Sequence, residues 1–170
     1  MELKNIDWFT RLAKALTAFT GSVLGLGLLS LIHELLYGAT DLPLIIAAFG
    51  ATAVVLYGCP DSPIAQPRNL FSGSLISAFV GVVTYHALQG FPIWFEGIVA
   101  ISTALFLMTL TGTLHPPGGA IAFIAIAGPP EIHQLGFLYL VYPIGTGISL
   151  MYLVALLMNR LTPEKHRPSA

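Results

Sequence analysis

The stretch GTLHPPGGA, residues Gly112 to Ala120, decides the fold because it interrupts an otherwise apolar chain. It lies between apolar runs long enough to sit in a membrane. Prolines and adjacent glycines in such a setting indicate a broken helix, and lipid tolerates irregular backbone only where protein or water surrounds it. We therefore expect this stretch to lie inside a bundle of membrane helices or beside a water-filled path.

The same stretch predicts an anion-binding helix start. Pro116 and Pro117 suit the first positions of a helix, whose opening N–H groups lack partners within the helix. Gly118 and Gly119 would let a ligand approach these groups closely, and the helix dipole adds partial positive charge there. His115 adds a side chain that can donate or accept a proton. We predict that these five residues bind an anion.

The composition indicates an all-α integral membrane protein. Of the 170 residues, 55% are hydrophobic and 9% are charged, whereas soluble domains carry roughly 25% charged residues. A net charge of −1 without a basic stripe argues against nucleic acid as a partner. The lone Cys59 leaves no intrachain disulfide, and packing is the favoured role for it. We expect the lipid bilayer as partner, with a homo-oligomer as an open alternative, and no cofactor or metal.

Hydropathy predicts six membrane segments, one of them short and broken. The fifth segment is too short to cross a bilayer unless it begins near the middle. The predicted segments are Leu12 to Tyr37, Pro43 to Gly58, Leu70 to Gln89, Ile98 to Leu110, Ala120 to Ala127 and Leu135 to Met158.

The loop GCPDSPIAQPRN, Gly58 to Asn69, gathers polar groups at one membrane face. It holds Arg68, the only arginine between the two chain ends. Arg68 is either an interfacial cation with its stem along apolar surface or an anion ligand, and both roles stay open. We include Arg68 and Gln66 in the predicted anion site.

The positions of the cations predict the topology. Lys and Arg collect on the cytoplasmic side, and with six segments every one of them falls on the side of both termini. Asp41, Glu96 and Glu131 then fall near the outer face. We therefore predict cytoplasmic termini in a bacterial inner (plasma) membrane. The cations are Lys4, Arg11, Lys14, Arg68, Arg160, Lys165 and Arg167.

The two halves of the sequence suggest an internal repeat. When the first half is shifted by 74 residues, Gly38 aligns with Gly112 and Pro43 with Pro117. Three segments followed by three would make the halves inverted, an architecture frequent in transporters. We predict a single transmembrane domain with a 3+3 inverted repeat. Its parts are an interfacial N-terminus at 1–11, halves at 12–90 and 91–160, and a cytoplasmic tail at 161–170.

The run from His115 to Ala120, together with SPIAQPRN at Ser62 to Asn69, resembles the HPP family of integral membrane proteins. The likeness covers nearly the whole chain. It implies nitrite transport, with which the family is associated, whereas descriptions of the family often count four spans rather than six.

The leading hypothesis is a transporter or channel for a small monovalent anion, nitrite above all, and not an enzyme. Two alternatives stay open. One is an intramembrane enzyme or metal site, although no HExxH pair places two ligands on one helical face. The other is a structural membrane subunit, in which the prolines and glycines only permit packing. The residues of the enzyme or metal alternative are His33, Glu34, His86 and His115.

Overall fold

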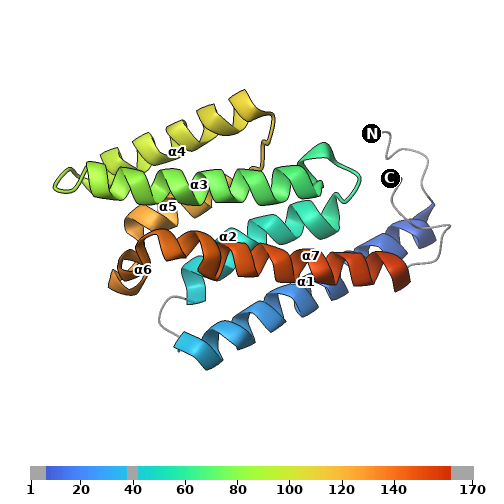
Figure 1. Ribbon diagram of the computed structural model, residues 1–170. Coiled ribbons are helices and arrows are strands. Elements are labelled where there is room, and N and C mark those ends of the chain that lie inside the picture. The colour runs from blue at the N-terminus through green and yellow to red at the C-terminus, as the bar shows by residue number, and fades with distance from the viewer. Residues whose placement is uncertain (1–6, 38–41, 162–170) are drawn as a thin grey trace.

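The computed structural model describes residues 7–37 and 42–161, and the regular elements within these ranges are all helical (Figure 1). The long helices are α1 (Trp8–Tyr37), α3 (Pro67–Ala87), α4 (Ile93–Thr111) and α7 (Thr146–Leu161). The shorter helices are α2 (Leu42–Ala53), continued by the π-helical η2 (Val54–Gly58), then η3 (Pro63–Ala65), α5 (Gly118–Ala127), α6 (Pro130–Leu135), η4 (Gly136–Leu140) and η5 (Val141–Gly145).

Helices long and apolar enough to cross a membrane run over Trp8–Leu35, Pro67–Ala87, Ile93–Thr111 and Pro130–Met158. Two shorter apolar helices, Ile46–Gly58 and Gly118–Ala127, lie between them in the chain. All six predicted apolar segments are therefore helical, in a set of four long and two short. A description that counts only full-length spans would reach four.

Helices α1 and α3 begin earlier than predicted, as do α4, at Ile93 rather than Ile98, and α5, at Gly118 rather than Ala120. Helix α1 starts at Trp8, where we expected an interfacial segment up to residue 11, and the Arg11 amide already donates to the Asp7 carbonyl at 3.1 Å. Helix α3 starts at Pro67, so the end of the polar loop forms its first turn. Proline is suited to this position because its missing N–H would lack a helical partner anyway.

The last predicted span is interrupted rather than continuous. Between α6 and α7, Tyr142 has extended backbone with φ −130° and ψ 130°, and Gly136 has φ 50°. Pro143 explains the first break, because a proline disfavours helical conformation in the preceding residue and supplies no N–H. Gly136 tolerates the positive φ at the second break.

Helix α5 lies behind α3 in Figure 1 and packs against both α3 and α4. Its residues join two apolar clusters: Ile121 and Ile124 belong to a cluster that also includes α1, α2 and α7. Ala122 and Ile126 belong to a second cluster with α3 and α4. A helix that is apolar all round is expected at such a junction, since each of its faces meets protein.

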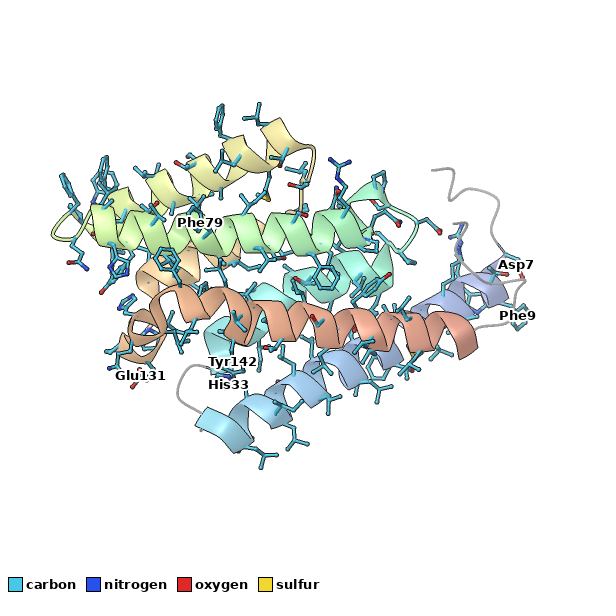
Figure 2. The ribbon with its side chains drawn as sticks, in the orientation of Figure 1. Asp7, Phe9, His33, Phe79, Glu131 and Tyr142 are labelled. Atoms are coloured by element: carbon cyan, nitrogen blue, oxygen red, sulfur yellow. The ribbon has the colours of Figure 1, made fainter. Side chains whose placement is uncertain are left out.

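Helices α1 and α3 begin, and α7 ends, at the same end of the molecule (Figure 1). We call this the cation-bearing end, because the described Lys and Arg residues lie near these helix ends. Asp7 and Phe9 mark it in Figure 2, and Glu131 lies at the opposite end. This arrangement agrees with the cation count, while the cytoplasmic assignment stays a prediction. Asp41 and residues 162–170 lie outside the described residues.

Candidate functional site

The chain between α4 and α5 is unwound, as its prolines and glycines predicted. Helix α4 ends at Thr111, and Gly112 takes the left-handed conformation, with φ 63° and ψ 35°. No helix covers Thr113 to His115, and Pro117 precedes the first residue of α5. Glycine is suited to the left-handed residue that ends a helix, because it has no Cβ to clash.

This unwound chain runs from the end of α4 to the middle of α3. Near the start of α3, Arg68 contacts Thr111 at the end of α4. Further along, a Cβ built on Gly73 would lie 2.6 Å from the His115 Cβ. Gly118 packs against Ser77, which lies at the centre of the 21-residue α3. The fifth helix therefore begins level with the centre of α3, while its start near the middle of the membrane stays a prediction.

The His115 side chain is fully buried, with an exposed fraction of 0%. Its Nδ1 lies 3.4 Å from the Ile64 carbonyl, and because a carbonyl only accepts, Nδ1 is the donor. Its Nε2 has no hydrogen-bond partner among the described residues. A buried polar atom without a partner costs roughly 1–3 kcal/mol. His115 is therefore a candidate for a functional role rather than a packing one.

The two glycine amides predicted to lack partners have them. Gly118 donates its N–H to the His115 carbonyl at 2.9 Å, and Gly119 donates to the Pro116 carbonyl at 3.3 Å. The prediction of free amides is wrong because the chain before α5 folds into a turn whose carbonyls accept these bonds. Pro117 is buried and Pro116 is exposed. The five motif residues therefore form a closed turn and not an open anion-binding site.

The same two glycines differ in the space around them. A Cβ on Gly118 would collide with the Ser77 hydroxyl and lie 3.1 Å from the Met108 sulfur. A Cβ on Gly119 would meet only the Ile101 side chain, at an ordinary 3.7 Å. Gly118 is therefore required for α5 to approach α3 and α4, whereas Gly119 is not.

The two predicted ligands from the preceding loop are engaged with backbone. Arg68 is exposed, and its Nη2 donates to the Thr111 carbonyl at 3.1 Å, where the last turn of α4 leaves carbonyls without helical partners. Gln66 is also exposed, and its Nε2 donates to the Pro60 carbonyl at 3.3 Å. The structure thus brings Arg68 to the chain that leads to His115 and leaves Gln66 within its own loop.

Three further side chains fasten the unwound chain, and the sequence analysis did not single them out. Asn69 donates from Nδ2 to the Leu114 carbonyl at 3.0 Å. Thr113 is buried, with its hydroxyl 2.7 Å from that of Thr111. Asn69 is the last residue of the SPIAQPRN motif, and its place in that motif was the sequence signal that could have singled it out. Thr113 and Thr111 carry no comparable signal.

The other histidines are engaged elsewhere. His33 is buried, and its Nδ1 lies 2.6 Å from the Tyr142 hydroxyl across α1 and η5 (Figure 2). The neighbouring Glu34 is exposed. His86 is exposed at the far end of α3. Among the residues that the structure describes, no three His, Cys, Asp or Glu side chains gather closely enough to hold a metal ion.

A groove of about 620 Å³ lies between α1, α3 and the η5–α7 region. Its lining is mostly apolar and includes the hydroxyls of Tyr142, Thr146 and Ser149. No charged side chain and no residue of the HPPGG turn lines it. It therefore suits an anion less well than the surroundings of His115.

The sequence pattern described as "HPP, transmembrane region" matches residues 9–168. The chain belongs to the HPP transmembrane family. Among its relatives is a transmembrane protein of Dictyostelium discoideum, 37% identical over 169 residues, which cover 98% of this chain and 56% of the relative. A second transmembrane protein of the same organism is 32% identical over 98% of this chain and 51% of its own length.

This HPP family chain thus spans about half the length of the curated relatives it matches. Their names state only that they are transmembrane proteins. No solved structure matches the chain. Family membership and the apolar helices together make this an integral membrane protein.

Proposed function

We propose that this HPP family protein transports a small monovalent anion, nitrite, across the membrane through a site at His115. The observation that carries the proposal is the fully buried His115, whose Nε2 has no described partner, on unwound chain beside Gly73 in the first half of α3. Ionisable residues at this depth among membrane helices most often mark a substrate or ion path. The association of the family with nitrite supports the choice of anion.

Two buried polar side chains, His115 and Ser74, suit a bent oxyanion. Ser74 is fully buried, its hydroxyl has no described partner, and it follows Gly73, the residue that touches His115. Nitrite accepts hydrogen bonds at two oxygens, so an imidazole and a hydroxyl can each serve one. A hydroxyl, and an imidazole that is neutral while no anion is bound, avoid much of the desolvation cost of burying a lysine or arginine.

The burial of His115 favours a carrier over an open channel. An anion reaches the side chain only when the segments that cover it move apart. The short helix η3 is the segment we assign to this movement, because its Ile64 carbonyl accepts the Nδ1–H bond. Arg68, exposed at the start of α3 and bonded to the end of α4, would raise the local anion concentration at the cation-bearing end.

Uptake into liposomes that contain the purified protein tests the proposal. We expect nitrite to enter faster than nitrate, chloride or formate, and faster than into protein-free liposomes at the same pH. The matched control is His86→Gln, which alters an exposed histidine at the other end of α3 and should leave uptake unchanged. If the four anions enter no faster with protein than without it, the structural-subunit hypothesis replaces this one.

A further inference from the structure

The hydrogen bond at Nδ1 fixes which nitrogen of His115 is free to act. Because the Ile64 carbonyl can only accept, Nδ1 carries a hydrogen in the bonded state. A neutral imidazole carries one hydrogen on its two ring nitrogens, so Nε2 then has a lone pair. That lone pair can accept a hydrogen bond, but it repels an anion.

An anion can therefore bind at Nε2 only together with a proton. If the proton sits on Nε2, the imidazolium donates to the anion through a charge-assisted hydrogen bond. If it sits on the anion, the neutral weak acid donates its O–H to the Nε2 lone pair. The two descriptions share one proton and one anion, so the bound state has the same composition and no net added charge.

We propose that His115 couples anion transport to protons, with one proton and one weak-acid anion carried together in an electroneutral symport. This inference rests on the proposed transport function and adds its coupling. The proton binds to the Nε2 lone pair or remains on the anion oxygen. When the anion leaves on the other side, the proton leaves with it, and no other bond is made or broken.

The surroundings of His115 contain few other groups that could carry the proton. The elements packed around it offer Asp61, in the loop before η3, and Arg68, near the start of α3. Helices α4 and α5 contribute Met108 and Gly118 at this level, neither of which is ionisable. His86 lies at the far end of α3 and Glu96 at the far end of α4.

Asp61 is the competing proton carrier, since its Oδ1 is buried without a described partner. It lies before η3, however, whereas the Nε2 without a described partner belongs to the unwound chain beside Gly73 of α3. Asp61→Asn therefore serves as a comparison variant. We expect it to keep the proton coupling that His115→Gln loses.

The main experiment follows nitrite uptake at about pH 7 to 8 in liposomes loaded with a pH-sensitive dye, with protein-free liposomes subtracted for diffusion of nitrous acid. We expect nitrite to acidify the interior and its uptake to be unaffected by a potassium–valinomycin potential. At low nitrite, the initial rate of uptake should fall by up to about tenfold for each unit by which the external pH is raised. Uptake that is driven by an inside-positive potential and leaves the interior pH unchanged would overturn the coupling while leaving nitrite transport established.

His115→Gln assigns the proton to this side chain, because glutamine can place a permanent neutral N–H near the position of Nε2. We add nitrite to the detergent-solubilised protein in weak buffer and measure the protons taken up from solution. We expect the parent protein to take up about one proton per site and His115→Gln to take up none. This readout does not require transport. Proton uptake that persists in His115→Gln and vanishes in Asp61→Asn would move the coupling to Asp61. Absence of any nitrite uptake by the parent protein would instead defeat the proposed function itself.

Discussion

The two short apolar helices, α2 with η2 and α5, occupy comparable places in the chain but are held in different ways. Phe49 of α2 is fully buried and fills the space left by Gly147 of α7. Tyr57 of η2 lies against Gly21 of α1 and donates its hydroxyl to the Met151 carbonyl at 2.9 Å. The aromatic rings of Phe49 and Tyr57 thus pack against glycines of neighbouring helices, and the Tyr57 hydroxyl has a hydrogen-bond partner.

The chain before α5 instead leaves one buried polar atom without a described partner. His115 is as deeply buried as Phe49, yet its Nε2 has no described partner. The difference teaches that a similar pattern of break and short helix can leave the buried side chains fully paired in one place and a histidine nitrogen without a described partner in the other. The inverted repeat that would relate the two halves stays a prediction.

The largest effect is expected from Gly118→Val, which should disrupt the packing of α5. The added side chain collides with the Ser77 hydroxyl and crowds Met108, and overpacking of this kind costs typically about 1–3 kcal/mol. We expect a lower melting temperature in detergent and, in liposomes, nitrite uptake reduced to the protein-free background.

Gly119→Val is the matched control for that change. Its Cβ would meet only Ile101 at 3.7 Å, so the melting temperature should stay close to that of the parent protein. If Gly119→Val proved as damaging as Gly118→Val, close packing would not be what separates the two glycines, and a direct role for the Gly119 amide would return.

The next effect is that of His115→Ala on transport. Loss of a charge-assisted hydrogen bond costs roughly 1.5–3 kcal/mol, so apparent nitrite affinity should fall by about ten- to a hundredfold. His86→Ala should change neither affinity nor rate, because that histidine is exposed and outside the site. Saturation curves of uptake measure both, and an unchanged curve for His115→Ala would remove the site from this residue.

The break before α5 was predictable because Pro116, Pro117 and the glycines act on their own backbone. Such local effects do not depend on what surrounds the chain. The partners of the Gly118 and Gly119 amides were not predictable in the same way. They depend on how tightly the turn closes, and both an open and a closed turn satisfy the sequence.

The rotation of the long helices was also beyond the sequence. In a soluble helix one apolar face shows what is buried, but in lipid every face is apolar, and the periodic signal is lost. For this reason the burial of His33, which is 3% exposed, and of Glu96, which is 5% exposed, could not be predicted. Cys59, expected to pack, is exposed because it lies in the turn after η2 and not in a helix.

A smaller effect, on stability alone, is expected from Tyr57→Phe. The change removes the hydroxyl that donates to Met151 and should cost about 1 kcal/mol. Nitrite uptake per folded protein should stay the same, because η2 packs and does not bind. A drop in uptake without a drop in melting temperature would give α2 and η2 a share in the site and dissolve the contrast with α5.

The smallest effect is expected from Arg68→Gln, and its form matters more than its size. Arg68 is exposed at the cation-bearing end, and it acts on the anion through the field it creates and on the chain through its bond to Thr111. A field effect is screened by salt, since the Debye length falls from about 10 Å at 0.1 M to about 3 Å at 1 M. We therefore expect Arg68→Gln to slow nitrite uptake by about two- to threefold at low ionic strength and hardly at all in concentrated sodium gluconate.

Arg68→Lys keeps the charge but not the planar guanidinium, so it should behave as the parent protein if the electric field of the charge causes the effect. A loss of uptake in both variants at every ionic strength would show that the bond to Thr111 is essential, and the site would then extend from His115 to the end of α4.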